Sequence, residues 1–404
     1  MMRRLTRLDP LTQLKYFNFF MYGSWSMLNP YLPLYFQDAG FQSMQIGILM
    51  SVGPLISLLA NPFWGYWSDR TQNPRLILII MLICNIATSQ MYFQSNQFSI
   101  VFSLMLLFYF FQTALNPISN SLTLYAIENT PYQFGTFRLW GSVGFAVMAL
   151  VSSPVIAYFG IDNLGFLYGS FVVLTLFLSF GLPNQAKQGK KTTFPREDFR
   201  KLMTSGLFVC FLLLSIIINT PNRMNSIFIS VYISGMGGNE VMVGWSWFIA
   251  AALEVPLFLI LDKYLKLTER AMFGLMAAVC ALYTVRWILM GIAVSPYHVV
   301  WIQLLHGFTF GITFYTGTQI CNFLVPKSVR NTGQAIYGLC WMGISGIVSG
   351  LLGGWVYDQL GAERMYVISA VMAAVGTTGF FIIWRHFRDK SPDHESESGS
   401  ASAG

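Results

Sequence analysis

Residues 164–182 read LGFLYGSFVVLTLFLSFGL and contain no charged side chain. A helix of ~20 apolar residues, rising 1.5 Å per residue, crosses the hydrocarbon core of a bilayer, which is ~30 Å thick. The backbone polar groups of such a helix are hydrogen-bonded within the segment, so lipid can surround it. This stretch therefore predicts a transmembrane helix.

Eleven further stretches on either side of it have the same character. The chain is 54% hydrophobic and 10% charged, whereas a soluble globular domain is roughly 25% charged. We therefore expect an all-α integral membrane protein with twelve transmembrane helices. The predicted spans are 13–35, 43–64, 75–93, 98–126, 137–159, 164–182, 204–234, 241–261, 271–294, 298–324, 331–357 and 364–386.

One long polar stretch, 183–203, separates the sixth span from the seventh. It predicts a cytoplasmic linker between an N-terminal six-helix half, 1–182, and a C-terminal six-helix half, 204–386. The remaining residues, 387–404, are rich in Ser and Glu, which is typical of a disordered tail.

The placement of the charges predicts the orientation of the chain. Most of its 24 lysines and arginines fall at the N-terminus, in the even-numbered connections, in the linker and in the tail. Cytoplasmic loops carry such an excess, so both termini are expected in the cytoplasm, with the chain spanning a bacterial inner membrane. This pattern explains the net charge of +7 without a nucleic-acid partner.

Several classes of function have no sequence signature here. The five cysteines lie in apolar runs without metal-type spacing, and the sequence contains no nucleotide-binding motif and no nucleophile–base cluster. We expect no metal, no cofactor and no enzymatic activity. The expected partners are a small solute, protons and membrane lipid, and the expected state is a monomer.

The connection between the second and third spans carries a motif. It reads Gly65-Tyr66-Trp67-Ser68-Asp69-Arg70 and resembles the G-x-x-x-D-R signature of the major facilitator superfamily. The resemblance implies a conformational latch formed by Gly65, Asp69 and Arg70, in which Asp69 accepts from a helix N-terminus and pairs with a nearby arginine. A solvated charged loop is the alternative reading.

Three other stretches resemble the branch of that superfamily that holds the lactose permease, nucleoside–proton symporters and phenylpropionate permeases. Residues 137–144 read FRLWGSVG, 284–286 read TVR, and 303–308 read QLLHGF. The resemblance implies two halves that rock around a central site and expose it to each side of the membrane in turn.

Ionisable side chains inside spans are costly and mark functional sites. Glu254 is the carboxylate that lies well inside a predicted span, and apolar surroundings favour its protonated form. Arg286 and His306 have similar predicted depths, and the resemblance assigns both to a proton and sugar network. Glu254, Arg286 and His306 are thus the predicted proton-coupling residues, although Glu254 could instead form a fixed ion pair.

The substrate-binding residues follow mainly from the resemblance. It places Arg138 against substrate hydroxyls, Ser142 one turn further on, and Phe145 where an aromatic ring stacks on a sugar. His306 and Thr309 are expected from the tenth span and Asn120 from the fourth, although Gln303 and Thr309 replace charged residues of the lactose permease. Other polar groups, Asn219, Asn222, Arg223 and Asn225, either line the cavity or gate, or serve helix packing.

These features predict a secondary transporter that takes up a small sugar or glycoside with a proton. Mixed charges and amides favour a neutral solute. A nucleoside or aromatic-acid symporter is the alternative, and so is a drug or sugar efflux antiporter, although the glycine pattern at 141–144 is unlike that of antiporters. A non-transporting receptor would need a soluble signalling domain, for which the linker and tail are too short.

Overall fold

The predicted all-α fold is confirmed by a computed structural model, which describes residues 9–128, 130–183, 200, 202–264 and 268–388. Each of the twelve predicted spans is helical over most of its length. Among the described residues, ten helices are long and apolar enough to cross a membrane. The tail from 389 and most of the predicted linker lie outside the described residues, so the domain boundaries placed there stay predictions.

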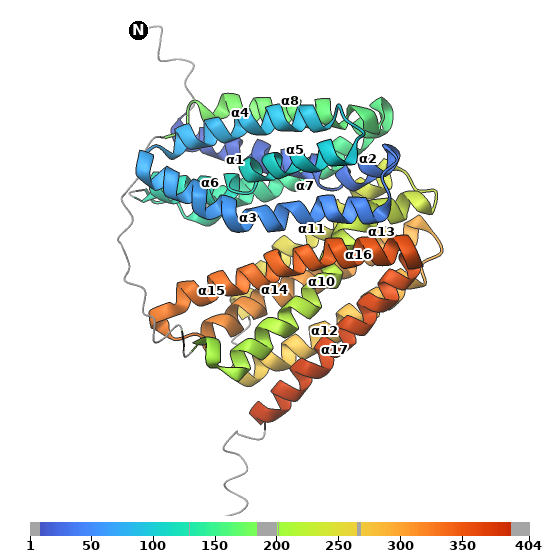
Figure 1. Cartoon of the computed structure of the whole chain (residues 1–404). Helices are drawn as coiled ribbons and strands as arrows, with labels where there is room; N and C mark the ends of the chain where they lie inside the picture. The colour runs from blue at the N-terminus through green and yellow to red at the C-terminus, as the bar shows by residue number, and fades with distance from the viewer. Residues whose placement is uncertain (1–8, 129, 184–199, 201, 265–267, 389–404) are drawn as a thin grey trace, which may run out of the picture.

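The helices that precede the linker form one set, which we call the N-terminal set (Figure 1). They are α1 (Pro10–Leu28), α2 (Leu32–Asp38), α3 (Ser43–Thr71), α4 (Pro74–Tyr92), α5 (Phe98–Gln112), α6 (Leu115–Ile127), α7 (Phe134–Phe159), the short η2 (Ile161–Asn163) and α8 (Leu164–Ser179).

The helices that follow the linker form the C-terminal set. They are α10 (Gly206–Gly235), α11 (Glu240–Tyr264), α12 (Glu269–Gly291), α13 (Pro296–Ile302), α14 (Leu304–Leu324), η3 (Lys327–Val329), α15 (Arg330–Gly338), η4 (Leu339–Ile344), α16 (Ser345–Leu360) and α17 (Ala362–Arg388). The segment η4 is a π-helix that joins α15 to α16.

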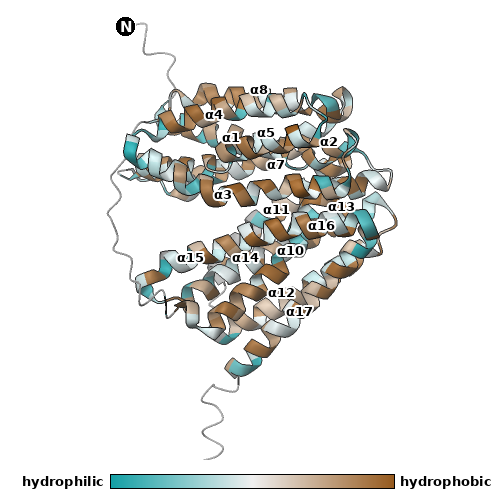
Figure 2. Ribbon diagram, viewed as in Figure 1, coloured by the Kyte–Doolittle hydropathy of each residue, from teal (hydrophilic) through white to brown (hydrophobic). Residues whose placement is uncertain are grey.

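The outer surfaces of both sets are apolar, as lipid requires. Large hydrophobic side chains such as Phe166, Phe177 and Ile382 are more than 60% exposed. Hydrophilic residues gather at the helix ends and in the connections (Figure 2). A continuous apolar surface of this size on a monomer is the signature of an interaction with membrane or protein, and the length of the helices identifies it here as the lipid-facing surface.

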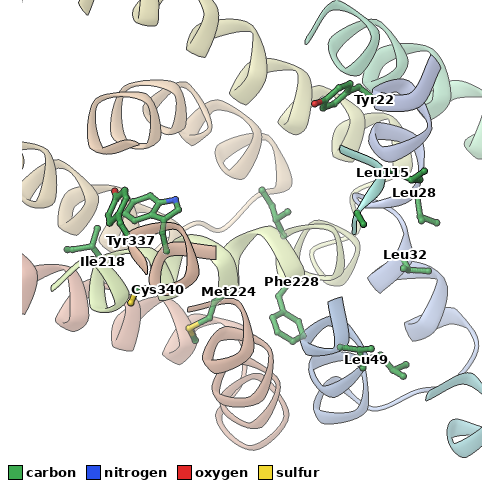
Figure 3. Close-up of a cluster of buried hydrophobic side chains, with 14 of the residues drawn as sticks. Tyr22, Leu28, Leu32, Leu49, Leu115, Ile218, Met224, Phe228, Tyr337 and Cys340 are labelled. Carbon is green, nitrogen blue, oxygen red and sulfur yellow. The ribbon is translucent and has the colours of Figure 1, made fainter. Parts of the chain in front are cut away.

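Buried side chains from both sets form one hydrophobic cluster. Figure 3 shows Leu28 and Leu49 of the N-terminal set on one side of the view, with Met224 and Phe228 of α10 beside them and Tyr337 of α15 further away. The two sets therefore share part of their packed interior.

The two sets touch mainly near one face of the molecule. We call the face where α8 ends and α10 begins the linker face, and the other the opposite face. Near the opposite face α3 packs on α16, α7 on α11 and α2 on α10, and the hydroxyl of Tyr31 donates to the carbonyl of Glu240 (3.3 Å). Toward the linker face the helices of the two sets diverge (Figure 1).

Glycines permit the close approach of α3 and α16. A Cβ on Gly47 would lie 2.1 Å from the carbonyl oxygen of Gly350, and one on Gly350 would lie 2.0 Å from Oγ of Ser51. Small residues allow such backbone contact between membrane helices. The glycines of the eleventh span thus pack against a specific partner, which is α3.

Candidate functional site

Arg286 of α12 is completely buried and is surrounded by uncharged partners. Its Nη1 donates to Oδ1 of Asn222 (3.3 Å) and Oγ1 of Thr309 (3.4 Å), and its Nη2 donates to Oε1 of Gln303 (3.0 Å). The guanidinium carbon lies 4.3 Å from the centre of the Trp287 ring. Neutral oxygens and an aromatic face thus compensate for part of the cost of burying this charge.

Glu254 of α11 meets His306 of α14 inside the C-terminal set. Oε1 of Glu254 lies 3.4 Å from Nε2 of His306, with side chains 26% and 13% exposed. The close approach of α11 and α14 depends on Gly307, where a Cβ would lie 2.5 Å from that of Leu253. The His306 ring also stacks on Phe310, with centroids 5.4 Å apart.

The three predicted proton-coupling residues thus lie in two adjoining contacts. One joins Glu254 to His306, and the other joins Arg286 to Thr309. Among the described residues, no hydrogen bond or ion pair joins Arg286 to Glu254; Glu254 contacts His306, while Arg286 contacts Thr309. Because His306 and Thr309 are three residues apart on α14, they lie on neighbouring turns of one helix face. Glu254 is therefore in direct contact with His306, and it is separated from Arg286 by about one turn of α14.

Arg138 of α7 lies on the N-terminal set and is exposed. Its guanidinium carbon is 4.2 Å from the centre of the Tyr22 ring, and the Tyr22 hydroxyl donates to Oδ1 of Asn116 (2.6 Å). Gly141 makes room for this ring, because a Cβ there would lie 2.5 Å from Cδ2 of Tyr22. The exposed guanidinium, stacked on a ring held in place by Asn116, is free to donate to a solute.

Two aromatic rings meet between the sets. Phe145 of α7 and Trp247 of α11 have centroids 6.3 Å apart, and the indole Nε1 of Trp247 is buried without a partner among the described residues. Ser142 and Asn120, the other predicted binding residues of the N-terminal set, are partly buried. Among the described residues, no hydrogen bond or ring contact joins Ser142 or Asn120 to the Phe145–Trp247 pair.

Sequence reasoning did not identify Tyr22 or Trp247. Both are aromatic residues in long apolar segments with many aromatic neighbours, so nothing in their spacing separates them from packing residues. A signal was available for Tyr22 only through Arg138, since a guanidinium inside a span needs an aromatic or polar partner.

The predicted latch lies at the linker face, at the end of α3. Asp69 and Arg70 are exposed, and Arg70 donates to the Tyr66 hydroxyl (3.1 Å) and lies over the Trp67 ring. Within the described part of the chain no ion pair holds Asp69. A Cβ on Gly65 would meet no atom within 4 Å, so no other described helix packs closely against this glycine in this conformation.

Arg223 of α10 is a third arginine within the spans, and it is partly buried. Its Nη2 contacts Sδ of Met342 in η4, and its Nε is buried without a partner among the described residues. The preceding residue, Asn222, accepts from Arg286 (3.3 Å). Away from the ends of their helices, α10, α12 and α11 thus carry the guanidiniums of Arg223 and Arg286 and the carboxylate of Glu254.

Comparison with known proteins identifies relatives that cover nearly the whole chain. The chain matches the family described as MFS_1 like over residues 11–368. It is 24% identical to the maltose permease of Geobacillus stearothermophilus, over 92% of this chain and 94% of that protein. It is 22% identical to the probable 3-phenylpropionic acid transporter of Escherichia coli (strain K12), over 89% and 93%.

Among solved structures, the nucleoside transporter NupG has the same fold. The two superpose with a TM-score of 0.78 at 16% identity, covering 94% of this chain and 99% of that one. Since the family match extends over most of the chain, and the long apolar helices agree with it, the superfamily predicted from the 65–70 motif is confirmed. The protein belongs to the MFS_1 like family and is a multi-pass membrane transporter of the major facilitator superfamily.

Proposed function

We propose that the protein takes up a small sugar or glycoside together with a proton, by alternating access. The observation that carries the proposal is the Glu254–His306 pair, in which a carboxylate and an imidazole meet 3.4 Å apart inside a span. An intramembrane acid beside a titratable base is a suitable place for a proton that must cross the bilayer.

The pair can take up and release a proton without separating. When Glu254 is ionised, the protonated Nε2 of His306 donates to the carboxylate. When Glu254 is protonated, its O–H donates to Nε2, and the imidazole holds its own proton on Nδ1. Protonation also removes the one negative charge of the site, which lowers the cost of moving it past the apolar interface during reorientation.

The arrangement of the helices supports alternating access. The sets meet at the opposite face and diverge at the linker face (Figure 1), as expected of one end state of a rocking motion. The excess of lysine and arginine around the linker supports a cytoplasmic linker face, which makes this the inward-facing state in an inner membrane. The Gly65–Arg70 end of α3 would then engage when the linker face closes.

A sugar is supported by the groups that face one another between the sets. Arg138 offers exposed donors beside the Tyr22 ring, and Phe145 and Trp247 supply aromatic faces, which suit the apolar side of a pyranose ring. The relatedness to a maltose permease agrees with this substrate class. Nucleosides, aromatic acids and exported drugs remain the alternatives that the experiment must separate.

The test measures external pH in a weakly buffered suspension of de-energised cells that express the protein, during pulses of sugars, nucleosides and aromatic acids. We expect alkalinisation with a sugar or glycoside, and its loss in Glu254→Gln. Glu363→Gln, which changes an exposed carboxylate at the start of α17, is the matched control and should respond like the wild type.

Two results would contradict the proposal in different ways. Alkalinisation that survives Glu254→Gln would remove Glu254 from the proton path. The absence of any pH response, together with efflux of a drug or sugar from proteoliposomes, would favour the antiporter. Binding of the sugar by purified Glu254→Gln shows that the variant is folded, so that loss of proton uptake is a loss of coupling.

A further inference from the structure

Arg223 is a partly buried arginine inside a described span, and little of its hydrogen-bonding capacity is used. A guanidinium has five N–H donors in a planar fork. Here the one contact of this fork is with the thioether sulfur of Met342, a weak acceptor, and the buried Nε has no partner among the described residues. Leaving such donors unpaired is costly away from water, so the geometry indicates a missing acceptor.

The other two arginines of the spans differ from Arg223 in this respect. The Nε of Arg286 also lacks a partner among the described residues, but this guanidinium donates to three oxygens and lies on Trp287. Arg138 stacks on Tyr22 at an exposed position. Arg286 is also completely buried, so it is not available to a solute in this conformation. Arg223 alone of the three is both partly buried and poorly paired.

The position of Arg223 suits contact with a solute. It contacts Met342, which is 53% exposed and belongs to η4, and η4 packs against α3 of the other set. The preceding residue, Asn222, accepts from Arg286 (3.3 Å), and α10 packs against α14, which carries His306. Arg223 therefore lies between the proton-coupling pair and the region where the two sets adjoin.

The charges of the region are unbalanced in one direction. Arg223 is adjacent in sequence to Asn222, which Arg286 contacts, and the nearby carboxylate is that of Glu254 beside His306. When Glu254 takes up a proton for transport, this group of residues carries two guanidiniums and no anion. A buried positive charge of this kind favours an anionic ligand.

We propose that Arg223 binds the carboxylate of the transported solute, and that the solute is a sugar acid, such as a glycoside of a uronic acid. The proposal rests on the proposed function for the sugar ring and the coupled proton, and replaces the neutral solute expected from the sequence. A carboxylate matches the planar fork of a guanidinium with two parallel hydrogen bonds. One proton and one monoanion would cross together, so the transport step would carry no net charge.

The experiment uses the full-length protein in proteoliposomes and two pairs of probes that differ in a carboxylate. One pair is methyl β-D-glucuronide and methyl β-D-glucoside, and the other is maltobionate and maltose. Initial uptake and internal pH are recorded with and without a potassium diffusion potential, and each probe's binding to purified protein is measured separately. The variants are Arg223→Gln and Arg223→Lys, and the control is Arg364→Gln, which changes an exposed arginine of α17.

We expect the acid of at least one pair to bind at least about tenfold more tightly than its neutral partner, as a charge-assisted hydrogen bond implies. That preference should disappear in Arg223→Gln, weaken in Arg223→Lys and persist in Arg364→Gln. Uptake of the acid should not respond to the diffusion potential. Equal binding within both pairs, no binding of either acid, or a preference that survives Arg223→Gln would overturn the proposal.

The outcomes separate this proposal from the proposed function. Proton uptake driven equally by maltose and maltobionate, and accelerated by an inside-negative potential, would keep proton–sugar symport and reject the role of Arg223. Arg223-dependent binding of the acids without proton uptake would keep the carboxylate site and reject symport. Because the comparison of acid and neutral probes is made on the wild-type chain, it holds even if an arginine variant folds poorly.

Discussion

Substitution of Gly47 should shift the equilibrium between the two end states. A Cβ at this position would lie 2.1 Å from the carbonyl oxygen of Gly350 and 2.9 Å from Cα of Gly354. Ordinary contacts of this kind are about 3.5 Å, so α3 and α16 would have to move apart by about 1 to 2 Å. The clash exists only while the sets meet at the opposite face.

The size of the shift follows from the cost of overpacking. An added side chain in a tight contact typically costs about 1–3 kcal/mol. If that cost falls on one end state alone, it changes the ratio of the two states by about 5- to 150-fold. The series Gly47→Ala, Gly47→Val and Gly47→Leu should therefore give increasing amounts of the state that is open at the opposite face.

The assay is a spin-label distance measurement across the opposite face. Labels at Gln37→Cys and Asn239→Cys, both exposed residues near that face, are placed in a chain whose five native cysteines are replaced. We expect a population with a longer distance to grow along the Gly47 series. Gly135→Leu is the control, since a Cβ there meets no atom within 4 Å.

Two results would refute the reasoning. One is a distance distribution of Gly47→Leu that overlays on that of Gly135→Leu, which would mean that the glycine contact does not determine closure. The other is an equal fraction of molecules with the longer distance in all three Gly47 variants and in the control. That result would trace the change to the loss of any glycine.

Two further predictions concern the polar groups of the site. Gln303→Leu removes the acceptor 3.0 Å from Arg286, so thermal unfolding in detergent should show a loss of about 1–3 kcal/mol, and the double variant with Arg286→Met should lose less than the two single variants together; additive losses would mean that the contact is not formed. Tyr22→Phe keeps the ring beneath Arg138 and removes the hydroxyl donated to Asn116, so it should raise the KM for uptake less than Tyr22→Leu does, and equal KM values would exclude a role for the ring.

The spans could be predicted from the sequence because lipid imposes a local requirement. A stretch such as 164–182 must satisfy its backbone within itself and present apolar side chains to lipid, whatever the rest of the chain does. The breaks in the helices within the predicted spans could not be predicted in the same way. The break between α1 and α2 follows Leu28 and places Tyr31 where it donates to the carbonyl of Glu240, 209 residues away.

The sequence predicted which residues belong to the site better than it predicted which of them are in contact. Depth along a span can be counted from the sequence, and this predicted similar depths for Arg286 and His306, while Glu254 was a candidate because it is a carboxylate well inside a span. The rotation of each helix about its axis depends on packing, which decides that His306 contacts Glu254 (3.4 Å) while Arg286 contacts Thr309 (3.4 Å). For the same reason nothing in the sequence linked Arg223 to Met342.

The π-helical segment η4 changes which residues of the eleventh span face the neighbouring helices. Such a segment holds one residue more than the corresponding α-helical turn, and each residue of an α-helix accounts for ~100° of rotation. Gly346, Gly350 and Gly354 all meet α3, and they do so with η4 in place before them. Deleting a single residue from 339–344 would leave a regular helix that is one residue shorter and still apolar, but would turn this glycine face about a quarter of a turn away from α3. The register of the two sets thus depends on an irregularity that a hydropathy profile does not detect.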